Sequence, residues 1–162
     1  MENQKQLLVK SVFDSWNMKI KEGDRLFDSL TDEQLEKEIA PGKNRGIYLL
    51  GHLAAVHDQM LPVLDFGKVQ YEHLNELFHD KPDKAVSDLP GISDLKMFWK
   101  LANERVTTKL SKLTADEWFQ KHTSISAEDF AKEPHRNKLN VVLNRTMHLA
   151  YHLGQLALLK NK

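Results

Sequence analysis

Residues 138–159 read KLNVVLNRTMHLAYHLGQLALL, and this stretch carries the clearest structural pattern in the chain. Residues suited to burial recur in it at steps of three and four, at Leu139, Val142, Thr146, Leu149, Leu153 and Leu156. This spacing places them on one face of an α-helix, as in the seam of a helix bundle. We therefore predict a long final helix whose apolar face packs against other helices.

Working outward, three more segments carry the same periodicity. Apolar residues at three- and four-residue steps predict long helices at about 3–29, 45–60 and 93–112. Asn44 and Ser93 stand where a helix-capping side chain is expected for the second and third of them. No segment shows the alternation of a strand, so the sequence predicts an all-α protein.

Two capping boxes follow the first and third of these helices. Thr31 precedes Gln34, and Thr114 precedes Glu117, so each pair can satisfy free N–H groups at the start of a short helix. The repeat of this pattern, together with the flanking Leu-Thr sequences, indicates two similar helical hairpins.

The segment between residues 61 and 92 is polar, contains several Pro and Gly residues, and is too long for a tight turn. We expect one short helix in it, at Tyr71–His79. A crossover of this length would let the second and third long helices run parallel, which gives a four-helix bundle of up-down-down-up order. Residues 1–162 are expected to form this bundle as a single domain.

Composition limits the function classes. The 162 residues are 41% hydrophobic, and 23 basic side chains balance 23 acidic ones, which disfavours nucleic-acid binding. Cysteine is absent, which excludes disulfides and thiolate ligands. No apolar run is long enough to span a membrane, and no secretory signal is recognisable. We expect a cytoplasmic protein that acts on a small molecule, without nucleic-acid or membrane partners, and we also consider a homodimer.

His148 and His152 stand at positions i and i+4 of the predicted final helix, where two imidazoles share one face and can bind one ion. Because the chain contains eight histidines, one pair with this spacing can easily arise by chance. Two surface or partly buried histidines without a metal are therefore the alternative interpretation. The apolar residues around them favour a position facing the bundle interior or a cleft.

His52 lies in an almost wholly apolar segment of the second long helix. It is either a hydrogen-bonded core residue or a ligand, and its position leaves both open. His57 is about 140° around the helix from His52, which places it toward solvent or the rim. The remaining histidines fall in polar segments and are expected to be solvated: His73, His79, His122 and His135.

The run from Asn144 to Gln155 resembles the HxxxHxGQ signature on the last helix of DinB/YfiT-like proteins, and Gly51-His52-Leu53-Ala54 is similar to the histidine motif on their second helix. The resemblance covers nearly the whole chain in helix number, crossover and motif order. It implies a bundle in which His52, His148 and His152 bind a divalent ion, nickel or zinc above all.

The resemblance also suggests roles around the metal. Gln155 would hydrogen-bond a ligand or metal-bound water, or simply be a polar helix residue. Tyr151 occupies a position where some relatives carry an extra histidine, and its hydroxyl either reaches the site or packs. Gly154 would admit a close neighbouring helix.

Three histidine ligands leave an open coordination position, which is typical of a catalytic metal. The reactive species would be metal-bound water or thiolate, because such an ion lowers the pKa of either. Members of the family include thiol-dependent S-transferases and metal-dependent hydrolases, so a low-molecular-weight thiol is a candidate cosubstrate. A non-enzymatic metal- or ligand-binding bundle is the alternative. Unperturbed histidines would release the metal below about pH 5.5–6.

Overall fold

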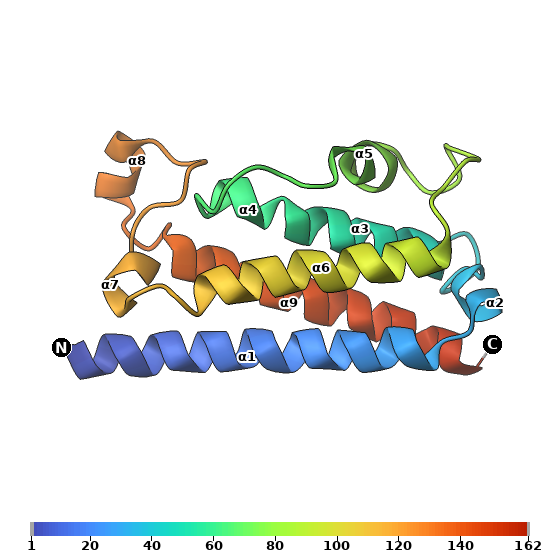
Figure 1. The fold of residues 1–162 in the computed structure, drawn as a ribbon, viewed down its shortest axis with the longest axis horizontal. Coiled ribbons are helices and arrows are strands. Elements are labelled where there is room, and N and C mark those ends of the chain that lie inside the picture. The colour runs from blue at the N-terminus through green and yellow to red at the C-terminus, as the bar shows by residue number, and fades with distance from the viewer. Residues whose placement is uncertain (1, 162) are drawn as a thin grey trace.

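The computed structural model describes residues 2–161, and this part of the chain is helical with no strand. The prediction of an all-α protein is confirmed. Its long helices lie side by side along the longest axis of the molecule (Figure 1). They are α1 (Glu2–Ser29), α3 (Gly46–Asp58), α6 (Ile92–Leu110) and α9 (Lys138–Ala157).

Short elements connect the long helices. They are α2 (Asp32–Leu35), α4 (Met60–Val63), α5 (Glu72–Asn75), the π-helix η1 (Glu76–Asp80), α7 (Ala115–Trp118), α8 (Ala127–Lys132) and the 3-10 helix η2 (Leu158–Asn161). The short helix expected at Tyr71–His79 is thus an α-helical turn that continues as a π-helix. The helix expected at 45–60 ends at Asp58, and a separate turn follows it.

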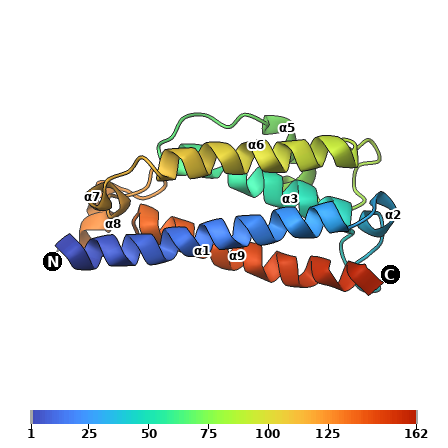
Figure 2. The same cartoon turned by 60° about the horizontal axis from the view of Figure 1, so that its bottom comes forward.

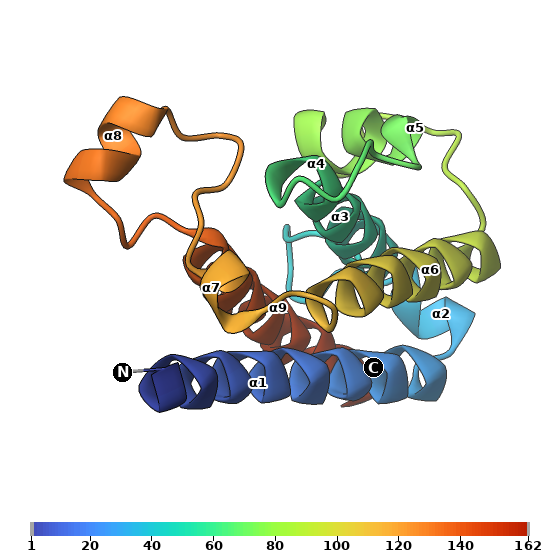
Figure 3. The ribbon, with the colours of Figure 1, turned by 60° about the vertical axis from the view of Figure 1, so that its left-hand side comes forward.

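The arrangement of the long helices can be followed by colour in Figures 1 and 2. Helix α1 runs from the N-terminus to the end where α2 lies, and α3 returns from there. The segment containing α4, α5 and η1 then passes over α3 and brings the chain back to the α2 end, where α6 begins. Figure 3 shows α7 and α8 at the opposite end, before α9 returns. Helix α3 packs mainly against α6, and α1 mainly against α9.

Apolar side chains from all four long helices form the core. In α1 the buried residues recur at steps of three and four, as Val12, Trp16, Ile20, Gly23 and Phe27 illustrate. Two indoles in this core have hydrogen-bond partners, because Trp16 Nε1 donates to Thr107 Oγ1 at 3.0 Å and Trp99 Nε1 donates to Asp24 Oδ1 at 2.8 Å. None of the described helices combines the length and the apolar composition needed to cross a membrane.

Both predicted capping boxes are present. Thr31 Oγ1 accepts from the Gln34 backbone N–H at 3.1 Å while Gln34 Oε1 accepts from the Thr31 N–H, and Thr114 and Glu117 repeat the arrangement. These reciprocal bonds satisfy N–H groups at the starts of α2 and α7.

The starts of α3 and α6 differ from the sequence prediction. Arg45 and Gly91, rather than Asn44 and Ser93, occupy their N-cap positions, and neither provides a side-chain cap. Asp83, from the crossover segment, accepts from the Arg45 backbone N–H at 2.7 Å and also pairs with its guanidinium. The first N–H group of α3, at Gly46, donates to the carbonyl oxygen of Lys37 at 3.1 Å. Contacts with other segments, rather than a side-chain cap, therefore hold the start of α3, and sequence patterns do not reveal them.

Candidate metal site

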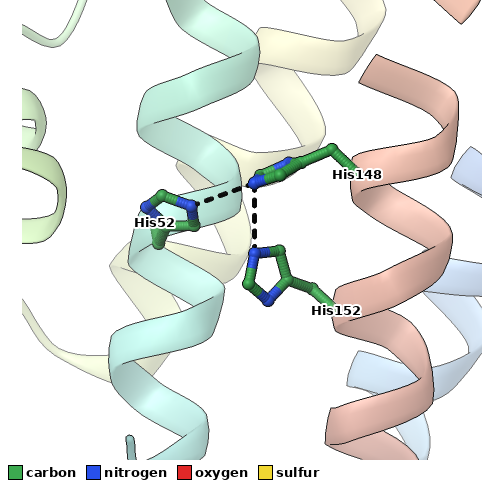
Figure 4. Close-up of side chains that lie close together, drawn as sticks. All are labelled: His52, His148 and His152. Atoms are coloured by element: carbon green, nitrogen blue, oxygen red, sulfur yellow. Dashed lines mark hydrogen bonds between the residues drawn. The ribbon is translucent and has the colours of Figure 1, made fainter. Parts of the chain in front are cut away.

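Three histidines from two helices meet at one point. His52 lies on α3, and His148 and His152 lie one turn apart on α9, with their side chains directed toward one another (Figure 4). The Nε2 atom of His148 is 3.3 Å from Nε2 of His52 and 3.1 Å from Nε2 of His152. Potential ligand atoms of the three residues all lie within 4.8 Å of one another. The structure thus brings together the three histidines that the sequence analysis singled out.

His52 is held in place by the crossover segment. Its Nδ1 donates a hydrogen bond to the carbonyl oxygen of Phe78 in η1, at 2.9 Å. The ring of Phe78 packs directly on Gly51, where a Cβ atom would lie only 2.5 Å from that ring. Gly51 is therefore needed for the close approach that brings the Phe78 carbonyl to His52. This explains why the glycine directly precedes the histidine.

His152 is oriented from the other side of the site. Its Nδ1 lies 2.7 Å from Oε1 of Gln155, and Gln155 Nε2 in turn donates to the hydroxyl of Tyr151 at 3.1 Å. Because the amide oxygen accepts, the proton of the neutral imidazole lies on Nδ1. Gln155 thus hydrogen-bonds His152, one of the two contacts that the sequence suggested for it. Tyr151 is exposed, but its hydroxyl contacts Gln155 and its ring packs against that of His152, with 5.1 Å between the centroids.

These hydrogen bonds determine the tautomers. A neutral imidazole with its proton on Nδ1 has a lone pair on Nε2. Both His52 and His152 accordingly present a bare Nε2 to Nε2 of His148. A single proton on His148 Nε2 can bond only one of them, whereas a cation can bind all three nitrogens.

Burial keeps these rings neutral. Desolvation lowers the pKa of His52 and of His152 below the usual histidine value. The pKa of His148 falls to about 4, first through burial and then through the nearby His152, His52 and Arg145. Neutral histidine is the form that binds a metal, so the site is in its binding form at neutral pH without having to lose protons.

The distances fit a first-row divalent ion. Two nitrogens bound at about 2.0–2.1 Å to a tetrahedral ion lie roughly 3.3–3.4 Å apart, close to the 3.1 and 3.3 Å between the histidine nitrogens. Three imidazoles suit zinc or nickel better than calcium or magnesium, which prefer oxygen. At metal sites a ligating histidine usually donates a hydrogen bond from its other ring nitrogen, as Nδ1 of His52 and of His152 do here.

The prediction for His57 is wrong. Its side chain is fully buried, with Nδ1 donating to Asn103 Oδ1 at 2.6 Å and its ring between Trp16 and Trp99. Burial lowers its pKa to about 3. The prediction required a solvent-facing side of α3, but nearly every residue of this helix is buried.

The remaining histidines are mostly solvated, as expected. His73, His79 and His135 are exposed, and His79 pairs with Asp80, while His122 is half-buried. The ring of His79 also stacks beside that of His52, with 6.2 Å between centroids, so it borders the site without joining it.

The structure corrects the role expected of Gly154 and adds Arg145. Gly154 is exposed, and a Cβ atom there would meet nothing within 4 Å among the described residues, so no helix of this chain packs on it. Arg145, three residues before His148, lies near enough to lower the pKa of His52 and His148. The three-residue spacing was visible in the sequence, but sequence reasoning did not select it.

Comparison with known proteins yields one match. No curated protein matches the chain. The profile of the DinB superfamily matches residues 21–156, which include His52, His148, His152 and Gln155. The matched region covers well over half of the sequence and all of α3 and α6. On this basis the chain belongs to the DinB superfamily.

Proposed function

We propose that this protein is a divalent-metal-dependent enzyme that acts on a small molecule, either as a thiol S-transferase or as a hydrolase. His52, His148 and His152 would bind the ion, nickel or zinc. The observation that carries the proposal is a pair of hydrogen bonds, from Nδ1 of His52 to Phe78 O and from Nδ1 of His152 to Gln155 Oε1. These bonds leave both Nε2 atoms without a proton and facing Nε2 of His148.

Residues of the chain orient the three histidines and keep their side chains uncharged. Phe78 and Gln155 hold two ligands in one tautomer, and burial keeps all three imidazoles unprotonated near pH 7. When bound, an ion with three protein ligands supplies a Lewis acid with an open position, which lowers the pKa of a coordinated water or thiol. The proposal includes a low-molecular-weight thiol as cosubstrate of the transferase reaction.

The proposal extends to the fold. We take the long helices to form a four-helix bundle of up-down-down-up order, in one domain. The common direction of α3 and α6 in Figure 1 and the single core shared by the long helices support it.

A non-enzymatic bundle that binds a metal or ligand is the second candidate. One observation favours it: a cavity of about 720 Å³ lies near α2, lined by Arg45, Lys84 and Pro90 among others, and none of the three clustered histidines lines it. A ligand bound in this cavity, apart from the histidines, would suit a binding protein better than an enzyme.

Elemental analysis of protein purified without an affinity tag tests the site. We expect one divalent ion per chain in the wild type and in the control His79→Ala, which removes an exposed histidine beside the site. His52→Ala and His148→Ala should lose the ion while circular dichroism shows unchanged helix content. Metal retained in both variants would refute the ligand set. A wild type that takes up neither nickel nor zinc would refute the proposed function.

Turnover distinguishes the two candidates. The metal-loaded protein is assayed with low-molecular-weight thiols and electrophiles, and separately with hydrolysable esters and amides. Turnover that is absent from His148→Ala and present in His79→Ala supports the enzyme. A loaded protein without turnover on any of these substrates favours the binding bundle.

A further inference from the structure

Arg145 borders the histidine cluster. It lies three residues before His148 on α9, about 4.5 Å lower along the helix axis and on the same face. Helical side chains lean toward the N-terminus, so the imidazole of His148 lies over the turn that contains Arg145. The side chain of Arg145 is half-buried. Its charge acts on His52 of the facing helix as well as on His148.

The guanidinium of Arg145 has no partner among the described residues. The other arginines each donate to a protein oxygen: Arg25 to Lys21 O, Arg45 to Asp83 and Glu36, Arg105 to Tyr71 and Arg136 to Glu133. Burial lowers the pKa of Arg145, and no carboxylate counteracts this effect. A half-buried, unpaired guanidinium has lost part of its hydration without gaining hydrogen bonds in return.

The cluster itself contains no negative charge. No acidic side chain raises the pKa of His52, His148 or His152, and the metal-binding cluster of the described residues consists of histidines only. Three neutral ligands would leave the full charge of a divalent ion uncompensated. The ion and Arg145 would then form two neighbouring positive centres with no protein anion between them.

We propose that the site binds an anionic small molecule, with Arg145 holding its carboxylate, phosphate or similar oxyanion while the reacting group lies at the metal. This proposal rests on the proposed function and specifies its substrate class. A guanidinium suits the task because its fork of N–H donors matches two oxygens of such a group. The ligand would also supply the negative charge that the site lacks.

The test uses two thiols of similar size on cobalt-loaded protein, whose visible spectrum reports binding at the metal. One is 2-mercaptoethanesulfonate, whose sulfonate coordinates metals poorly, and the other is uncharged 2-mercaptoethanol. We expect the wild type to bind the anionic thiol roughly ten- to a hundredfold more tightly, the range of a charge-assisted hydrogen bond. Arg145→Gln should abolish this preference, and Arg145→Lys should keep part of it.

Arg136→Gln is the matched control. It removes the same charge from a position just before α9, but Arg136 is exposed and paired with Glu133. It should keep the full preference. Equal binding of the two thiols by the wild type, or a preference that persists in Arg145→Gln, would overturn the proposal while the cobalt spectrum still shows an intact metal site.

The failure of the metal site itself is a separate result. If the wild type takes up none of cobalt, nickel and zinc, the proposed function fails, and nuclear magnetic resonance of the metal-free protein decides whether Arg145 binds anions. Shifts of the Arg145 and His148 signals on adding inorganic phosphate, absent in Arg145→Gln, would support the anion site. Unchanged signals would overturn it.

Discussion

The hydrogen bond between His152 and Gln155 shows how one residue can tune the candidate site. Gln155 accepts from Nδ1 and so keeps the lone pair on Nε2. We predict that Gln155→Leu weakens metal binding about 10- to 100-fold, the range found when such supporting partners are removed. Competition with a chromophoric chelator measures the change.

Tyr151→Phe is the control for this prediction. It removes the hydroxyl that accepts from Gln155 Nε2 but leaves the bond to His152 in place. Its metal affinity should stay close to that of the wild type. Equal losses in the two variants would mean that Gln155 acts through Tyr151 or through packing.

His57 is a second case at the scale of single residues, because its position on the helix led to a wrong prediction of its exposure. Its angle from His52 suggested solvent exposure, yet Asn103 from α6 covers it and accepts a hydrogen bond from its Nδ1. The apolar run of residues 47–55 already indicated a helix buried on all sides. Angular reasoning holds only for helices that have a polar face.

At the scale of elements, the site depends on how closely η1 approaches α3. The ring of Phe78 occupies the space where a side chain of residue 51 would begin. We predict that Gly51→Ala displaces Phe78, lowers the free energy of unfolding by about 1–3 kcal/mol and weakens metal binding through His52. Urea denaturation and chelator competition measure the two effects.

Gly154→Ala provides the matched control on α9. Both positions are helical, but the space around Gly154 is open. Alanine there should raise the free energy of unfolding by about 0.5–1 kcal/mol, because it reduces the conformational freedom of the unfolded chain. If the two variants were destabilised equally, helix geometry rather than the contact with Phe78 would be responsible.

At the scale of the whole molecule, buried neutral histidines couple stability to pH. The folded-state pKa lies below the unfolded value for His52, His57, His148 and His152, at about 3 for His57 and about 4 for His148. In this range the unfolded state binds more protons, so stability falls as pH falls. Their contribution is complete above about pH 6.5 and is lost progressively toward pH 4.

We therefore predict that the free energy of unfolding of the metal-free protein declines between about pH 6.5 and 4. Urea denaturation across this range measures it, and His57→Phe is expected to reduce the slope. A flat profile would contradict the pKa shifts. The lowered pKa values also revise the metal-release expectation of about pH 5.5–6, because protons compete less well for these nitrogens, and we now expect release at lower pH.

The sequence by itself determined the helices and the candidate ligands. Apolar spacing located the long helices, capping boxes located two short ones, and the spacing of His148 and His152 indicated a shared helix face. These features depend on residues within about one helical turn of each other, where geometry is nearly constant.

Only the tertiary structure decided what depends on contacts between distant segments. It set the carbonyl of Phe78 against His52 and Asp83 against Arg45 at the start of α3. It also buried His57 under Asn103 and left Arg145 without a partner among the residues that the structure describes. Each of these outcomes follows from which helices pack together and how closely. That choice is made by the complementarity of whole surfaces, and no local pattern of residues encodes it.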